Sequence, residues 1–121
     1  KVIKIYEYPN CSTCKKALKF LAQNRFAVEK VDIFQKAPTK AELKQMLKYL
    51  DGNLRRLFNT TGTLYQEMKL SEKISSMSES EAIEILSKNG RLVKRPFVLL
   101  ENTGLVGFHE SQWRKTLLGE E

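Results

Sequence analysis

Residues 2–14 read VIKIYEYPNCSTC, and this stretch decides the fold. The β-branched and aromatic residues at positions 2–6 predict a buried strand, and the Pro-Asn pair at 9–10 predicts the turn that ends it. Two cysteines, Cys11 and Cys14, follow the turn directly. The sequence therefore places both thiols just beyond the end of a strand.

An amphipathic helix is predicted after the turn. Over residues 12–24, apolar residues recur at helical spacing with lysines between them. Residues 28–33 then alternate in the manner of a strand. Together these segments predict a βαβ unit, in which the two strands are parallel and the crossover is right-handed.

The middle of the chain carries helix signals. Thr39 with Glu42, and Ser78 with Glu81, have the spacing of a capping box, in which two residues cap one another's backbone at a helix start. The remaining signals are helix ends at 51–52 and 89–90 and shorter helices at 54–58 and 64–68.

Strand signals return near the end of the chain. Residues 97–100 and 105–108 predict a β-hairpin around a turn at 102–104, and residues 110–118 predict a closing helix. The order of elements is therefore βαβ, then helices, then ββα, which is an α/β fold.

Composition limits the class of protein. A chain of 121 residues, 41% hydrophobic and 29% charged, fits one globular domain. No stretch reaches the roughly 18 apolar residues of a membrane span, and the start lacks the apolar core of a signal peptide, so we expect a cytoplasmic protein. Two cysteines and one histidine are too few for a disulfide-stapled scaffold or a tetrahedral zinc site. We therefore expect redox or nucleophilic chemistry and no metal.

The chain is basic, with a formal charge of +7. This charge favours approach to anions, acidic protein surfaces or nucleic acid. The alternative is that the charged side chains only keep the surface solvated. The basic residues Arg91, Lys94 and Arg95 have no recognition helix or aromatic platform beside them, so we expect no direct binding of nucleic acid.

Cys11 and Cys14 form a Cys-x-x-Cys pair at the opening of a helix within a βαβ pattern, which favours a redox motif. The unpaired N–H groups and the dipole of a helix N-terminus favour a thiolate, so Cys11 is the candidate nucleophile. Cys14 lies one helical turn further on, where it can attack a mixed disulfide at Cys11 and leave an internal disulfide. The alternative is a pair of buried, inert cysteines.

Arg95 and Pro96 precede the first strand of the hairpin. From the residues alone, a trans proline that opens an edge strand is favoured over a cis proline in a tight turn. The Arg95 guanidinium suits an oxyanion or a carboxylate. His109 is disfavoured as a general base, and Trp113 is expected in the core.

Three separated stretches resemble one known family: YEYPNCSTCKKA at 6–17, LFNTTG at 57–62 and VKRPFV at 93–98. They resemble the arsenate reductase-like family, which also contains the Spx-type regulators. The second stretch is most similar to an uncharacterised branch of that family that also carries the Cys-x-x-Cys pair.

The resemblance implies a single domain over residues 1–121. Its thioredoxin-like core, βαβ plus ββα around a mixed four-stranded sheet, would comprise residues 1–35 and 92–121. Residues 36–91 would be an inserted helical subdomain.

The resemblance also assigns site residues. It implies that Pro96 is cis and faces Cys11, and that Arg95 holds the oxyanion; Asn10, Ser12 and Thr13 complete the expected substrate-binding group. Two further arginines of arsenate reductases are missing. Asn59 stands at one of their positions, and Gly107 or Phe108 stands at the other.

Two functions follow as hypotheses. The first is a monomeric thiol-dependent oxidoreductase that acts on an oxyanion or disulfide, with Cys11, Cys14 and Arg95 catalytic, no bound cofactor, and glutathione, glutaredoxin or thioredoxin as reductant. The second is an Spx-like redox sensor, in which a Cys11–Cys14 disulfide controls binding to the RNA polymerase α subunit.

Overall fold

The structure is a computed structural model and describes residues 2–120. Its strands, α-helices and 3₁₀-helices (η) are, in chain order, β1 (Val2–Glu7), α1 (Ser12–Gln23), β2 (Ala27–Asp32), α2 (Lys40–Tyr49), η1 (Leu54–Leu57), α3 (Thr63–Glu67), α4 (Leu70–Lys73), η2 (Ile74–Ser76), α5 (Glu79–Lys88), η3 (Gly90–Leu92), β3 (Phe97–Leu99), β4 (Gly104–Val106) and α6 (Glu110–Leu118).

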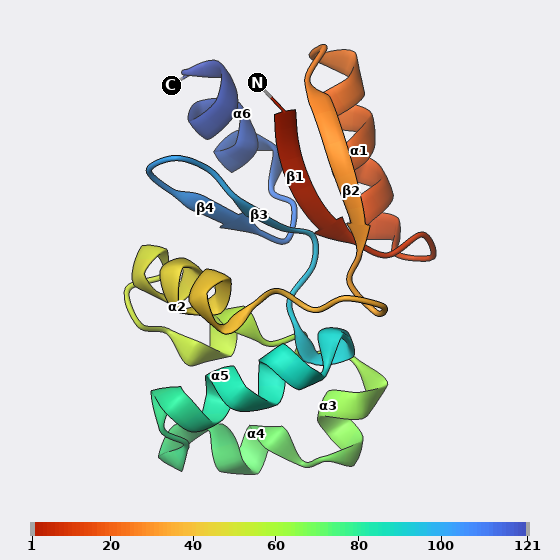
Figure 1. Ribbon diagram of the computed structural model, residues 1–121. Coiled ribbons are helices and arrows are strands. Elements are labelled where there is room, and N and C mark those ends of the chain that lie inside the picture. Colours follow the sequence, from red (N-terminus) through yellow and green to blue (C-terminus); the bar gives the residue numbers. More distant parts are fainter. Residues whose placement is uncertain (1, 121) are drawn as a thin grey trace.

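The strands form one mixed sheet in the order β2-β1-β3-β4 (Figure 1). β1 is parallel to β2 and antiparallel to β3, and β3 is antiparallel to β4. The helices from α2 to η3 are inserted between β2 and β3. This arrangement confirms the expected thioredoxin-like α/β core with a mixed four-stranded sheet.

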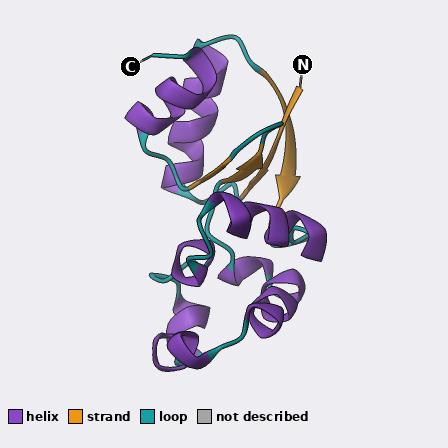
Figure 2. Cartoon of the chain, turned by 90° about the vertical axis from the view of Figure 1, so that its left-hand side faces the viewer, coloured by secondary structure: helices purple, strands orange, loops and turns teal. Residues whose placement is uncertain are grey.

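Two helices cover one face of the sheet. α1 and α6 lie together on that face, and the other helices gather on the opposite side and below (Figure 2). Ile5 and Trp113 are fully buried between this face and the two helices. The Trp113 indole N–H donates to the carbonyl oxygen of Gly107 at 3.2 Å, which satisfies its one polar group.

The opposite face packs against the inserted helices. Tyr6 and Phe97 point to this side and join one core with residues of α2 and α5. β1 is therefore buried on both faces, which explains why positions 2–6 read as a nearly continuous apolar run.

The helix starts follow their capping signals. Thr39 accepts from the Glu42 backbone N–H, and the Glu42 side chain accepts from Thr39 N, so the capping box of α2 is complete. Ser78 accepts from the Glu81 backbone N–H, but no return bond from the Ser78 N–H to Glu81 forms within the described residues. The second predicted capping box is thus only a one-way N-cap.

One close contact joins the inserted helices to the sheet. Gly90, at the start of η3, lies against the end of β2: a Cβ atom added there would sit 1.7 Å from the carbonyl oxygen of Ile33. No side chain fits in that space. The contact fixes the segment that leads toward Arg95 and Pro96.

Strand pairing determines where Arg95 and Pro96 lie. Tyr6 in β1 pairs with Phe97 in antiparallel β3. The residues just before β3 therefore lie beside the residues just after β1, which bring the chain to Cys11.

Candidate functional site

Cys11 is the N-cap residue of α1. Its backbone N–H donates to the Tyr8 carbonyl oxygen at 3.1 Å, and its sulfur accepts from the Cys14 backbone N–H at 3.3 Å. The N–H groups of Ser12 and Thr13 donate to no other group within residues 2–120. These free donors point outward at the start of the helix, where they favour a negative sulfur or an anionic ligand.

The Cys11 thiol is half-buried and acidic. Burial alone would raise its pKa, but hydrogen bonding with Cys14 and the neighbouring Arg95 guanidinium outweigh that effect and lower the pKa of Cys11. A larger share of Cys11 is therefore thiolate at neutral pH than in an ordinary cysteine.

Cys14 differs from Cys11 in both its burial and the direction of its pKa shift. It is 0% exposed, and burial, followed by the adjacent Cys11 thiol, raises the pKa of Cys14 to about 12. Both cysteines are free thiols. The pair therefore combines an accessible thiol of lowered pKa with a buried thiol of raised pKa one helical turn further on.

Arg95 is aimed at this site with unused donors. Its Nε and Nη1 atoms are buried and have no hydrogen-bond partner. The guanidinium carbon lies 5.1 Å from the centre of the Phe34 ring and 5.9 Å from that of the Tyr8 ring. Buried N–H donors without acceptors are costly, so these two atoms favour a ligand that supplies an acceptor.

The peptide bond between Arg95 and Pro96 is cis. The trans isomer that the residues alone favoured is therefore wrong, and the expectation from the family resemblance is confirmed. The expected edge position is also wrong, because β3 is an inner strand between β1 and β4. Pro96 tolerates this place because it stands before the strand, and its carbonyl oxygen still accepts from Gly107 N at 2.9 Å.

An aromatic shelf supports the two arginines. The rings of Tyr8 and Phe34 stack with centroids 3.8 Å apart and an interplanar angle of 16°. Arg91 also lies over Phe34, with its guanidinium carbon 5.1 Å from the ring centre. No local pattern predicts this shelf, because Tyr8 and Phe34 follow two different strands and Arg91 comes from η3.

A cavity of about 280 Å³ opens beside this shelf. Its lining combines two arginines, one acidic residue, two neutral polar side chains, a glycine and two apolar side chains: Phe34, Asn59, Gly62, Thr63, Leu64, Glu67, Arg91 and Arg95. Arg95 is thus shared between the cavity wall and the Cys11 thiol. No group of three or more His, Cys, Asp or Glu within the described residues is arranged to hold a metal ion.

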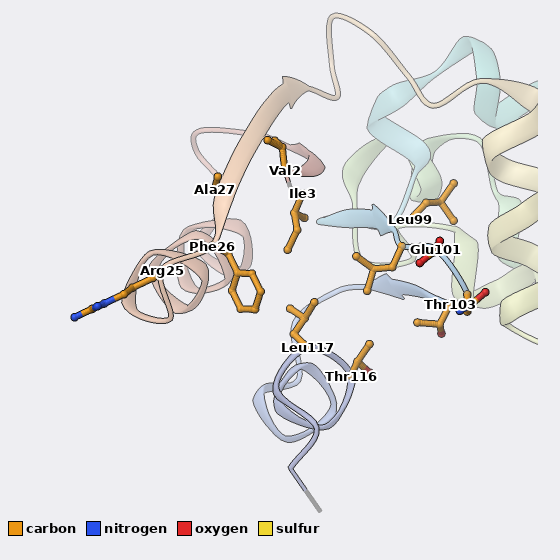
Figure 3. Close-up of a pocket in the computed structure, with 12 residues that line it drawn as sticks. Val2, Ile3, Arg25, Phe26, Ala27, Leu99, Glu101, Thr103, Thr116 and Leu117 are labelled. Atoms are coloured by element: carbon orange, nitrogen blue, oxygen red, sulfur yellow. The ribbon is translucent and has the colours of Figure 1, made fainter.

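A larger hollow, about 880 Å³, lies at the other end of the sheet (Figure 3). It is lined by the start of β1, the end of β3 and part of α6, including Val2, Leu99 and Leu117. Neither cysteine and none of the expected site residues lines it. The smaller cavity, by contrast, is linked to the Cys11 thiol through Arg95, which lines it.

The structure also locates the other expected residues. Asn10 and Ser12 are exposed and Thr13 is half-buried, and all three flank Cys11 along the chain. Asn59 reaches the same cavity as Arg95. Phe108 instead packs on the Trp113 ring, with centroids 5.1 Å apart, in the core on the α1 and α6 side. Phe108, one of the two residues at which the second missing arginine was expected, is therefore engaged in apolar packing.

The acidity of Cys11 predicts its alkylation profile. Iodoacetamide reacts with thiolates, so the rate at Cys11 should rise with pH to a midpoint below that of an ordinary cysteine, about 8.5. Arg95→Gln removes a charge that favours the thiolate and should move the midpoint to higher pH. Arg25→Gln, an exposed residue at the far end of the sheet, is the matched control. A midpoint unchanged by Arg95→Gln would contradict this role of Arg95.

None of the helices in the described part of the chain combines the length and the apolar character that crossing a bilayer requires. This finding concerns residues 2–120.

Comparison with known proteins agrees with the fold and the motifs. The profile of the ArsC family matches residues 6–116. The uncharacterized protein YusI of Bacillus subtilis is 37% identical over 113 residues, which is 93% of this chain and 96% of YusI. The global transcriptional regulator Spx of Streptococcus agalactiae is 28% identical over 116 residues, 96% of this chain and 83% of that protein.

A solved structure also resembles this chain over nearly its whole length. The crystal structure of a protein from Bacteroides fragilis, described as putative ArsC family related, superposes with a TM-score of 0.88 at 42% identity. The match covers 93% of this chain and 95% of that one. The family contains arsenate reductases and Spx regulators, which was the resemblance drawn from three short motifs. The chain belongs to the ArsC family.

Proposed function

We propose that the protein is a thiol-dependent oxidoreductase whose nucleophile is the Cys11 thiolate and whose resolving thiol is Cys14. One observation carries this proposal: the two thiols lie in a single helical turn with pKa values shifted in opposite directions, beside an arginine whose donors are unused. The proposal includes a cytoplasmic location, where thiols are kept reduced.

The reaction balances as a two-electron exchange. The Cys11 thiolate attacks one sulfur of a substrate disulfide, breaks the S–S bond and releases one substrate thiolate, which takes up a proton from water. Cys14 then gives up its proton and attacks the Cys11 sulfur, which expels the second substrate thiolate and forms the Cys11–Cys14 disulfide. Two electrons pass from the cysteine pair to the substrate.

Regeneration needs an external thiol. Glutathione, glutaredoxin or thioredoxin would return two electrons to the internal disulfide. The high pKa of Cys14 supports this order of events, because Cys14 stays protonated until the mixed disulfide forms beside it. Cys11 is also the more accessible sulfur, so we expect the external thiol to attack there.

A disulfide is favoured over arsenate as substrate. Arg95 supplies buried donors for an anion. Neither Asn59 nor the partly buried Phe108, which follows β4, supplies a cation. A tetrahedral oxyanion with several negative oxygens would therefore meet one family arginine instead of three.

Cys14→Ser tests the assignment of roles. Reduced Cys14→Ser protein, mixed with 2-hydroxyethyl disulfide, should accumulate a mixed disulfide at Cys11, because no second thiol resolves it. Mass spectrometry of the quenched protein should show the adduct on Cys11, whereas the parent protein should show the internal disulfide. Turnover with arsenate and with 2-hydroxyethyl disulfide is then compared in a glutathione and glutaredoxin system. Absence of an adduct would remove Cys11 as the nucleophile.

A redox-sensing regulator is the second candidate. The relative named Spx favours it, since the similarity extends over 96% of this chain. In this alternative, the Cys11–Cys14 disulfide would change a surface that binds the RNA polymerase α subunit, and no turnover would be needed. Binding of the purified α C-terminal domain to only one redox state, without disulfide turnover, would favour the regulator over the enzyme.

A further inference from the structure

The cavity beside Arg95 carries both signs of charge. We propose that it binds the free amino-acid end of a disulfide substrate, with the α-carboxylate held by Arg91 and Arg95 and the α-ammonium by Glu67, while the substrate sulfur reacts at Cys11. This inference rests on the proposed function and names its substrate class.

The carboxylate half of the proposal rests on the two arginines. Both guanidinium carbons lie 5.1 Å from the centre of the Phe34 ring, so one ring supports both cations. Within residues 2–120 neither arginine has a carboxylate partner, and Arg95 keeps Nε and Nη1 buried without an acceptor. Two guanidiniums that line one cavity without a carboxylate partner repel each other, and a shared carboxylate relieves that repulsion with oriented hydrogen bonds.

The ammonium half rests on Glu67. Glu67 lines the same cavity, yet its carboxylate forms no ion pair with either arginine or with any other cation in the described residues. A ligand that is only anionic would be repelled by Glu67. A ligand that carries an ammonium next to its carboxylate would pair with Glu67 through the ammonium and with the two arginines through the carboxylate.

The volume also suits a small zwitterionic group. The cavity encloses about 280 Å³, just under the roughly 300–1,000 Å³ of ordinary small-molecule sites. Asn59 and Thr63 add neutral polar atoms to the lining. Arg95 links the cavity to the nucleophile, because it lines the cavity and also acts on the Cys11 thiol. In this proposal a group anchored in the cavity presents its attached sulfur to Cys11.

The test uses single-turnover rates of the reduced protein with four small disulfides of different charge. They are 2-hydroxyethyl disulfide (neutral), 3,3′-dithiodipropionate (anionic ends), cystamine (cationic ends) and cystine (zwitterionic ends). Each second-order rate constant for oxidation of Cys11 is measured by quenching with an alkylating agent and mass spectrometry. Each rate in a variant is divided by the rate of the parent protein with the same disulfide, which removes the intrinsic reactivity of that disulfide.

The two side chains should have distinct effects. Arg91→Gln should lower the rates with cystine and 3,3′-dithiodipropionate about fivefold to tenfold, the effect of one charged hydrogen bond at a partly exposed site. Glu67→Gln should lower the rate with cystine by a similar factor and raise the rate with 3,3′-dithiodipropionate. The rate with 2-hydroxyethyl disulfide, which carries no charge, should change less in either variant than the rate with cystine. Arg25→Gln, which removes the same charge at the far hollow, should leave all four rates within about twofold.

Two outcomes would overturn the inference while leaving the proposed function intact: equal effects of Arg91→Gln and Arg25→Gln, or a Glu67→Gln protein that reacts with cystine as the parent does. A parent protein that fails to react with 2-hydroxyethyl disulfide at Cys11 would overturn the proposed function itself. The neutral disulfide thus separates the two failures.

Discussion

Cys11→Ser is expected to lower the single-turnover rate of disulfide reduction by at least about three orders of magnitude. The serine hydroxyl stays protonated at neutral pH, so Arg95 and the helix N-terminus have no sulfur anion to stabilise. Serine is close to cysteine in size and also favours the N-cap position, so the fold should be retained. The rate is measured by release of substrate thiol from 2-hydroxyethyl disulfide.

Cys14→Ser is the matched control for this variant. It keeps the first step, release of one substrate thiol per chain, and blocks only the second. A Cys11→Ser protein that releases substrate thiol at the rate of the Cys14→Ser protein would show that the nucleophile lies elsewhere.

Gly90→Ala should lower the free energy of unfolding by about 3 kcal/mol or more, measured by urea denaturation. The added Cβ would lie 1.7 Å from the Ile33 carbonyl oxygen and 2.8 Å from its carbon. Both atoms belong to the backbone, so no side-chain rotation removes the clash. The contact joins η3 to the end of β2, and a shift there also moves Arg91 in the cavity wall.

Gly119→Ala provides the comparison for Gly90→Ala. Gly119 has a positive φ of 71° but meets no atom within 4 Å, so its substitution costs only backbone strain, about 1 kcal/mol. Equal losses of stability in the two variants would mean that the Gly90 region relaxes and that the close approach to Ile33 is not required.

Local sequence patterns were sufficient for the main architecture. The closing helix occupies residues 110–118 as predicted, and the βαβ unit and the hairpin form the expected sheet. These elements have strong periodicity and clear end signals, so local rules describe them well. α4 and η2 were not predicted separately. Lys69, with φ of 53°, separates α3 from α4 without a glycine to mark the break.

The site was predictable only in part. Cys11 and Cys14 stand out because a local motif defines them, and Arg95 was found through the family resemblance. The stacking of Tyr8 on Phe34, the place of Arg91 over that ring and the approach of Glu67 depend on how separate elements pack. No periodicity or spacing encodes such contacts. The cis isomer of the Arg95–Pro96 peptide bond was also not predictable from the residues alone, because the local sequence favours one isomer only weakly.

The central claim, that Cys11 and Cys14 act as one redox pair, is tested most directly by a redox titration. The protein is equilibrated in glutathione buffers from reducing to oxidising, quenched with an alkylating agent and analysed by mass. We expect one reversible two-electron transition from two alkylated thiols to a Cys11–Cys14 disulfide, and no such transition in Cys14→Ser. Two thiols that stay alkylatable across the whole range, or a disulfide that forms only between chains, would contradict the claim.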